Sequence, residues 1–138
     1  MSKAPLRSPR QMLAGWVHLA RFVDKIRLYH DGKLPADYQA NFCGGFDGRW
    51  LEASGVNKET FLEAVRAAKD DAAVEQWVRA NVRKTPAEIE VFNRFVLNRG
   101  RSDEMSARLV ERKKESGLEG RTDIQTFVDF IDADEGRL

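Results

Sequence analysis

Apolar residues recur three and four positions apart along most of the chain, the spacing that gathers them on one face of an α-helix. These faces are Leu19, Phe22, Val23, Ile26 and His30; Phe61, Leu62 and Val65; Val74, Trp77 and Val78; Ile89, Phe92, Phe95 and Val96; and Ile124, Phe127, Val128 and Ile131. No segment shows the strict apolar-polar alternation of a half-buried strand. We therefore predict an all-α fold, a single-domain compact bundle of about six or seven short helices with no sheet.

Capping residues mark where several helices should begin. Segments 8–11, 85–88 and 122–125 each place Ser or Thr three residues before Gln or Glu, and the first two carry proline at the first helical position. We predict a helix start at each of these capping boxes. Asn57 and one of Asp70 or Asp71 are further candidate caps.

Two of the expected helices differ in burial. The helix that ends before Gly100 carries apolar side chains over nearly half of its surface, which predicts the central buried helix. Segment 103–116 offers only Met105 and Leu109 as a narrow apolar stripe, with oppositely charged residues spaced one turn apart. That segment should lie on the surface.

Length and cysteine content limit the class of protein. A chain of 138 residues buries about two-thirds of its unfolded surface, enough for one core. Its one cysteine forms no internal disulfide, no apolar run approaches a membrane span, and residues 1–10 do not resemble a secretory signal. We expect one helical domain over 1–138, with a flexible basic N-terminus at 1–7 and an acidic end at 134–138, in the cytoplasm and without a membrane partner.

The charges nearly cancel, to +1, but they are unevenly distributed. Residues 1–30 hold six basic and one acidic residue, a net +5, whereas residues 123–135 hold five acidic and no basic residues. We predict that these two ends dock on each other. A second group of basic residues at 79–101 is interleaved with acidic residues and contains no known nucleic-acid recognition motif. Nucleic acid is therefore not expected as a partner.

Segment 41–50 is the best candidate for a ligand-facing loop, because it combines three glycines, three aromatic residues and an Asp/Arg pair. Phe46 and Trp50, together with Trp16, would form apolar walls, and Arg49 would bind a carboxylate or phosphate through parallel hydrogen bonds. In the alternative interpretation the aromatic residues anchor the loop in the core, while Asp47 caps a helix that ends at Gly55.

A cationic stripe is predicted beside this loop. If the helix that ends near Asp31 already includes His18, then His18, Arg21 and Lys25 share one side of it, next to its apolar face, and would suit an anionic ligand. In the alternative interpretation these three side chains are solvated, and the negative charge of Asp24 compensates their positive charge. Cys43 would be a nucleophile only with a general base beside it, and is otherwise a small buried apolar residue.

We predict no metal site and no cofactor. Residues 132–136 begin like a calcium loop, but the third acidic position is glycine and no closing glutamate follows. The glycines of segment 41–50 match neither a phosphate-binding loop nor a dinucleotide fingerprint.

Several short strings together resemble a known family. They are Leu6-Arg7-Ser8-Pro9-Arg10, Val17-His18-Leu19, Asp24-Lys25-Ile26-Arg27, Gly45-Phe46-Asp47-Gly48-Arg49 and the closing segment 131–137. The chain resembles, over nearly its whole length, a family of small bacterial proteins catalogued as a domain of unknown function, number five thousand and sixty-nine. The resemblance implies one bacterial cytoplasmic domain and carries over no reaction, cofactor, partner or catalytic residue. It also implies a chain break near residues 15–18 and a helix starting near Leu19, because proline often replaces Ala20 in the family.

Three functional hypotheses remain open at this stage. The first is a binding or interaction module with a polar-aromatic pocket for an anionic small molecule or an acidic protein segment. The second is a small enzyme in which His18 or Asp47 is the acid or base and Arg49 stabilises negative charge. The third is a structural helical oligomer. For the first, the expected ligand-binding residues are His18, Arg21, Lys25, Phe46, Asp47, Arg49 and Trp50.

Overall fold

The computed structural model of the protein describes residues 5–138. The elements are β1 (Met12–Leu13), β2 (Trp16–Val17), α1 (Leu19–His30), α2 (Ala36–Gln39), α3 (Gly45–Ser54), α4 (Lys58–Ala67), α5 (Asp71–Asn81), α6 (Pro86–Asn98), α7 (Ser106–Glu115) and α8 (Phe127–Asp134). The helices confirm the predicted all-α class. The expectation of no sheet is wrong only for the short β1–β2 hairpin.

The hairpin replaces the helix predicted to begin at Ser8. The Ser8 carbonyl accepts one hydrogen bond, from the Gln11 N–H, and the chain then extends into β1. Ala14 and Gly15 both have positive φ, 54° and 85°, as a two-residue turn that matches the twist of a hairpin requires. The helix itself starts at Leu19, as the family resemblance implied.

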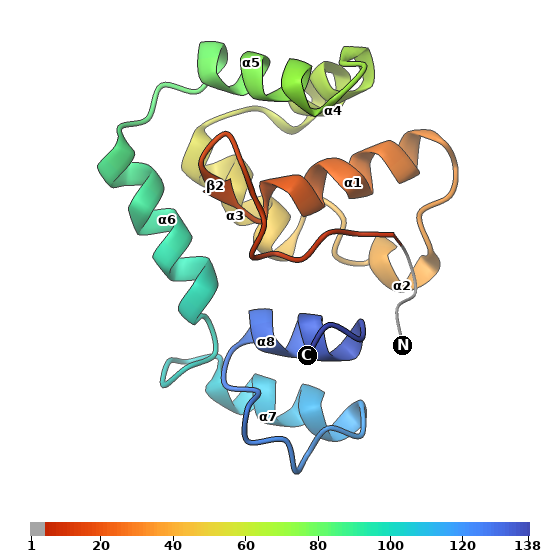
Figure 1. The fold of residues 1–138 in the computed structure, drawn as a ribbon, viewed down its shortest axis with the longest axis vertical. Coiled ribbons are helices and arrows are strands. Elements are labelled where there is room, and N and C mark those ends of the chain that lie inside the picture. Colours follow the sequence, from red (N-terminus) through yellow and green to blue (C-terminus); the bar gives the residue numbers. More distant parts are fainter. Residues whose placement is uncertain (1–4) are drawn as a thin grey trace.

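The helices form layers joined along one side by α6 (Figure 1). One part contains α1, α3 and the hairpin, with α4 and α5 beyond them, and the other contains α7 and α8. The central buried helix is α1 rather than α6, since Leu19, Phe22 and Ile26 are fully buried whereas Val91 on α6 is 70% exposed. The prediction for α6 was wrong because the helix spans both parts and packs only one side against them.

Within residues 5–138, each of these parts has its own hydrophobic cluster. The larger one surrounds α1 and contains the edge-to-face rings of Trp16 and Trp50, with Phe61 against Trp50 at 4.7 Å between ring centroids. The smaller one joins α7 to α8 through Leu109 and Phe130. Segment 103–116 therefore lies at the surface as expected, anchored by its short apolar stripe. Among the described residues, no helix has the length and apolar character to cross a membrane.

Most of the predicted caps are confirmed. Side chains of Asn57, Asp70 and Thr85 accept from backbone N–H groups at the starts of α4, α5 and α6, and Thr85 completes its capping box with Glu88. The box expected at 122–125 forms instead four residues later, where Thr126 and Asp129 cap α8.

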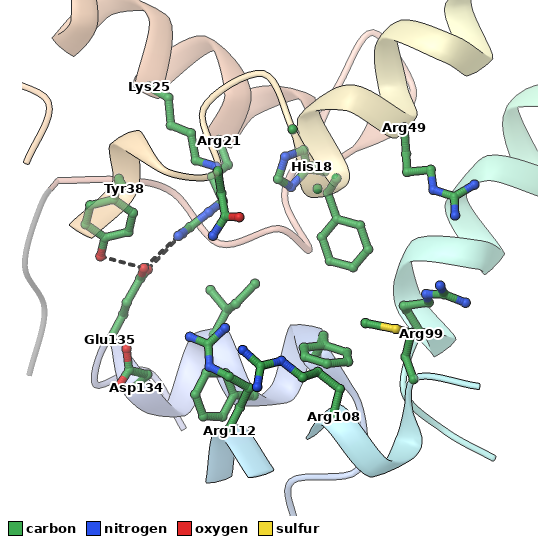
Figure 2. Close-up of a pocket in the computed structure, with 18 of the residues that line it drawn as sticks. His18, Arg21, Lys25, Tyr38, Arg49, Arg99, Arg108, Arg112, Asp134 and Glu135 are labelled. Atoms are coloured by element: carbon green, nitrogen blue, oxygen red, sulfur yellow. Dashed lines mark hydrogen bonds and ion pairs between the residues drawn. The ribbon is translucent and has the colours of Figure 1, made fainter. Parts of the chain in front are cut away.

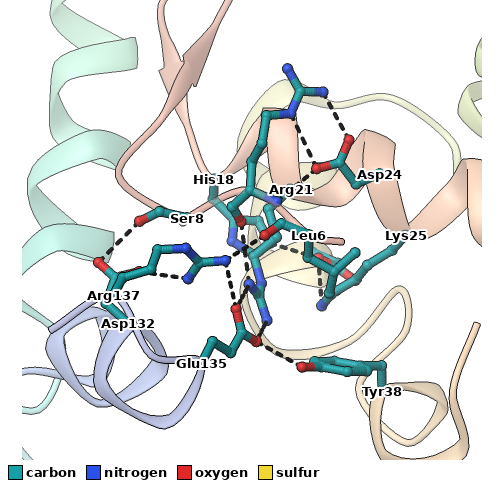
Figure 3. A network of polar contacts seen from close by, with 12 residues as sticks. Leu6, Ser8, His18, Arg21, Asp24, Lys25, Tyr38, Asp132, Glu135 and Arg137 are labelled. Atoms are coloured by element: carbon teal, nitrogen blue, oxygen red, sulfur yellow. Dashed lines mark hydrogen bonds and ion pairs between the residues drawn. The ribbon is translucent and has the colours of Figure 1, made fainter. Parts of the chain in front are cut away.

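The two ends of the chain dock as their charges predict (Figure 3). Arg10 pairs with Asp129 and Asp132, and Ser8 also donates to Asp132. Residues 1–4 of the segment expected to be flexible lie outside the described residues, but Leu6 at its end is buried and accepts from Arg137. The acidic stretch 123–135 thus supplies ion-pair partners to the N-terminal segment.

Candidate functional site

A cavity of about 740 Å³ lies between the α1–α3 part and the α7–α8 part (Figure 2). Its lining consists of His18, Arg21, Lys25, Asp37, Tyr38, Asn41, Gly44, Gly45, Phe46, Arg49, Phe95, Arg99, Met105, Arg108, Arg112, Phe127, Phe130, Ile131, Asp134 and Glu135. The volume falls within the range of small-molecule sites in proteins.

Basic side chains reach this cavity from both sides. Arg49 and Arg99 lie at one end, and Arg108 and Arg112 point up from α7 toward the wall formed by α1 (Figure 2). Residues 108 and 112 are one helical turn apart, so α7 presents both on one face. Six Lys and Arg side chains line the cavity against the three acidic residues Asp37, Asp134 and Glu135, so the lining carries a formal net charge of +3, compared with +1 for the whole chain.

Aromatic rings orient three of these arginines. The Arg49 and Arg99 guanidinium carbons lie 4.9 and 5.0 Å from the centroid of the Phe95 ring, and that of Arg112 lies 5.2 Å from the Phe130 centroid. Such stacking favours a guanidinium while leaving its N–H groups available at the edge of the plane. Two cations against one ring also repel each other, and an anion between them would relieve that repulsion.

The carboxylates of five ion pairs that these arginines make lie outside the cavity lining. The pairs are Arg49–Glu52, Arg99–Asp103, Arg99–Glu104, Arg108–Glu111 and Arg112–Glu115. The four glutamates are 62–77% exposed, whereas Asp103 is 26% exposed, and exposed ion pairs contribute about 0–1 kcal/mol. An anionic ligand would thus compete with weak, solvated partners at Arg49, Arg108 and Arg112.

A buried polar cluster lies behind the wall formed by α1 and α3. The Asp47 carboxylate is fully buried and accepts from His18 Nε2 at 2.6 Å, from the Cys43 N–H at 3.0 Å and from Lys25 Nζ at 3.3 Å. Burial opposes ionisation of Asp47, but the His18 hydrogen bond and the Lys25 charge outweigh it and lower its pKa. Burial lowers the pKa of both His18 and Lys25, with Asp47 opposing the shift in each case.

Glu135 connects the α8 side of the cavity to α1 and α2 (Figure 3). Its carboxylate accepts two hydrogen bonds from Arg21, at 2.8 and 2.7 Å, one from the Tyr38 hydroxyl, and pairs with Arg137. Burial and this hydrogen bond to Glu135 raise the pKa of Tyr38 to about 12. We call Arg21, Tyr38, Glu135 and Arg137 the clasp.

The structure brings together five of the seven sequence-predicted ligand-binding residues. His18, Arg21, Lys25, Phe46 and Arg49 all line the cavity. Asp47 is absent from the lining and lies against His18, and Trp50 is absent from it and packs in the core beside Trp16. Asp47 is in the first turn of α3 as the alternative interpretation supposed, but the N-cap residue is Gly44.

Cys43 lies next to this cluster without the features of a nucleophile. Burial and the neighbouring Asp47 charge raise the pKa of its thiol, which favours the protonated form. Its backbone, with φ of 64°, turns the chain so that its N–H reaches Asp47.

Sequence reasoning missed the half of the cavity that the C-terminal elements supply. Segment 103–116, which contains Arg108 and Arg112, is predicted to lie on the surface, and Arg99 belongs to the second group of basic residues at 79–101. Phe95 is predicted to face the core, and Phe130 carries no prediction. The i,i+4 spacing of Arg108 and Arg112 on a helix with little apolar surface was an available signal. Nothing in the sequence showed that this face meets α1 and α3.

Within residues 5–138, no group of three or more His, Cys, Asp or Glu side chains is arranged to hold a metal ion. The fold and cavity define an all-helical protein with a basic, aromatic-lined pocket between two parts of the bundle. The chain belongs to the family described as Domain of unknown function (DUF5069), which matches residues 3–137 and confirms the resemblance seen in the sequence. No match was found among curated proteins.

Proposed function

We propose that this protein is a binding module for a small organic anion, held in the cavity between α1–α3 and α7–α8. The observation that carries the proposal is the convergence of Arg49, Arg99, Arg108 and Arg112 on one cavity, with the carboxylates of five of their ion pairs outside it. Guanidinium groups bind carboxylate and phosphate through paired, charge-assisted hydrogen bonds.

The ligand would also carry an apolar body. Phe46, Phe95, Phe127 and Phe130 share the lining with the arginines, and such rings favour an apolar or aromatic group over a hydrated inorganic ion. A carboxylate or phosphate on a compact apolar skeleton satisfies both kinds of surface. A small molecule fits a volume of about 740 Å³ better than an acidic protein segment, which would need a longer groove.

The test is calorimetric titration of the protein with succinate, tricarballylate, benzoate and phenyl phosphate. These probes vary the number of charges, the type of anion and the apolar body separately. We expect saturable binding of at least one probe, weakened by added salt as charge-assisted contacts require.

Arg108→Gln/Arg112→Gln should reduce that affinity about tenfold or more, because each charge-assisted hydrogen bond contributes about 1.5–3 kcal/mol. Arg94→Gln is the matched control, since Arg94 is 76% exposed and lies outside the lining. Binding that the double variant leaves intact would contradict the proposal, and so would an absence of binding both to these four probes and to their hydroxylated analogues.

The His18–Asp47 pair favours one second candidate, a small enzyme acting in the same cavity. Asp47 holds one ring nitrogen of His18, the arrangement that orients a general base, and Arg49 is available to stabilise developing negative charge. Conversion of a bound anion that depends on His18 would distinguish this candidate from a binding module, which returns its ligand unchanged.

A further inference from the structure

His18 has hydrogen-bonding capacity that the described part of the chain leaves unused. His18 is one of the residues that line the cavity, its side chain is 2% exposed, and its Nε2 meets Asp47, whereas its buried Nδ1 has no hydrogen-bond partner within residues 5–138. Buried polar atoms in proteins are nearly always paired, because an unpaired one costs about 1–3 kcal/mol. A partner for this nitrogen must therefore come from outside the described residues, as a ligand in the cavity would.

Asp47 determines which nitrogen of His18 carries the proton. Its ionised carboxylate only accepts hydrogen bonds, so the Nε2–H of His18 must donate to it. In the neutral ring Nδ1 then carries a lone pair. Protonation of Nδ1, which would make the imidazole a cation, is disfavoured because the ring is buried close to the charges of Lys25 and Arg21. Nδ1 is thus an acceptor.

The backbone fixes this ring in place. His18 has φ of 69°, a conformation that is unfavourable for residues other than glycine and that proteins retain where the surroundings enforce it. Its N–H donates to the Pro9 carbonyl at 2.7 Å, and its carbonyl accepts from the Phe22 N–H. Phe46 packs edge-on against the ring, with 5.5 Å between centroids. Because Nδ1 is itself buried, a ligand pairs with it only if a side chain packed against the ring, such as Phe46, moves aside.

We propose that Nδ1 of His18 accepts a hydrogen bond from a hydroxyl group of the bound anion. The ligand class is then a hydroxylated organic anion, with its carboxylate or phosphate at the arginines and its hydroxyl at the α1 wall. This inference rests on the proposed function and adds a requirement to it. A site with a buried acceptor discriminates against the analogue that lacks the donor, because that analogue leaves the acceptor unpaired.

Matched pairs of anions test the requirement by calorimetry. The pairs are succinate and malate, tricarballylate and citrate, benzoate and 4-hydroxybenzoate, and phenyl phosphate and 4-hydroxyphenyl phosphate, the second member of each adding a hydroxyl. We expect the hydroxylated member of at least one pair to bind about tenfold more tightly. In His18→Gln this preference should disappear while the affinity for the other member stays, since a glutamine amide can still donate to Asp47.

A measurement on the unmodified protein covers the case in which His18→Gln fails to fold. Nitrogen NMR of the labelled imidazole should show Nε2 protonated and Nδ1 unprotonated, and the preferred hydroxylated anion should shift Nδ1 whereas its partner should not. A proton on Nδ1, or equal affinities within every pair, would overturn this inference and leave anion binding intact. Failure of all eight anions to bind would overturn the proposed function as well.

Discussion

Gly100 is a residue whose missing side chain determines how α6 meets the α7–α8 part. A Cβ at this position would lie 2.9 Å from Cδ2 of Phe127 and 3.2 Å from Leu109, and φ is +93°. Gly100→Ala should lower the free energy of unfolding by about 2–4 kcal/mol, from overpacking and backbone strain together. Urea denaturation measures this loss.

Gly117→Ala is the control for Gly100→Ala. Gly117 also has positive φ, +73°, but a Cβ there would meet nothing within 4 Å. It should therefore lose only about 1 kcal/mol, the part due to backbone strain. Equal losses in the two variants would show that the contact with Phe127 is unimportant.

His18 also makes stability depend on pH. Burial lowers its pKa in the folded protein, so below about pH 6.5 the unfolded chain binds a proton that the folded protein resists. The free energy of unfolding should fall as the pH drops through this range. It should fall further near pH 4, because the pKa values of Asp47 and Glu135 are lowered in the folded protein. Their carboxyl groups therefore take up protons more readily in the unfolded chain at that pH.

Denaturation at a series of pH values checks this dependence. In His18→Gln the decrease between pH 7 and pH 5 should flatten, whereas the loss near pH 4 should remain. A decrease of the same slope in both proteins would assign it to other groups.

At the scale of elements, the clasp holds α8 against α1 and α2. Arg21→Met removes the guanidinium from Glu135, whose side chain is 3% exposed, and leaves a buried charge with fewer partners. We expect a loss of about 3 kcal/mol in denaturation. Arg21→Met/Glu135→Leu should recover part of it, since no unpaired carboxylate remains.

The control for the clasp is Arg66→Met, which breaks an exposed pair with Glu63 on α4 and should change stability little. The account of the clasp would be wrong if Arg21→Met cost no more than this control. Because Arg21, Tyr38 and Glu135 also line the cavity, Arg21→Met should weaken anion binding in parallel.

Helices with local signals were predictable from the sequence, whereas the hairpin was not. The caps at Asn57, Asp70 and Thr85 act within a few residues, so the sequence alone specifies them. At Ser8 the same kind of pattern does not start a helix, because the Ser8 hydroxyl donates instead to Asp132, which is 124 residues away. The Ala14–Gly15 turn also lacks the Asn-Gly or Asp-Gly pair typical of such hairpins.

At the scale of the whole molecule, the candidate site joins segments distant in sequence. One wall comes from the first half of the chain and contains His18, Arg21, Lys25 and Arg49. These basic residues could be predicted because the sequence shows them as a cationic stripe and a nearby loop arginine. The opposite wall comes from α7 and α8. Its position depends on the docking of the two ends, whose opposite charges predicted contact but not which faces would enclose a cavity.

The most direct test of anion binding is an NMR titration of the labelled protein with the tightest-binding probe, following arginine side-chain and backbone N–H signals. The account predicts saturable shifts at Arg49, Arg99, Arg108 and Arg112, with Arg94 unaffected. Shifts spread over exposed arginines and rising linearly with concentration would contradict it.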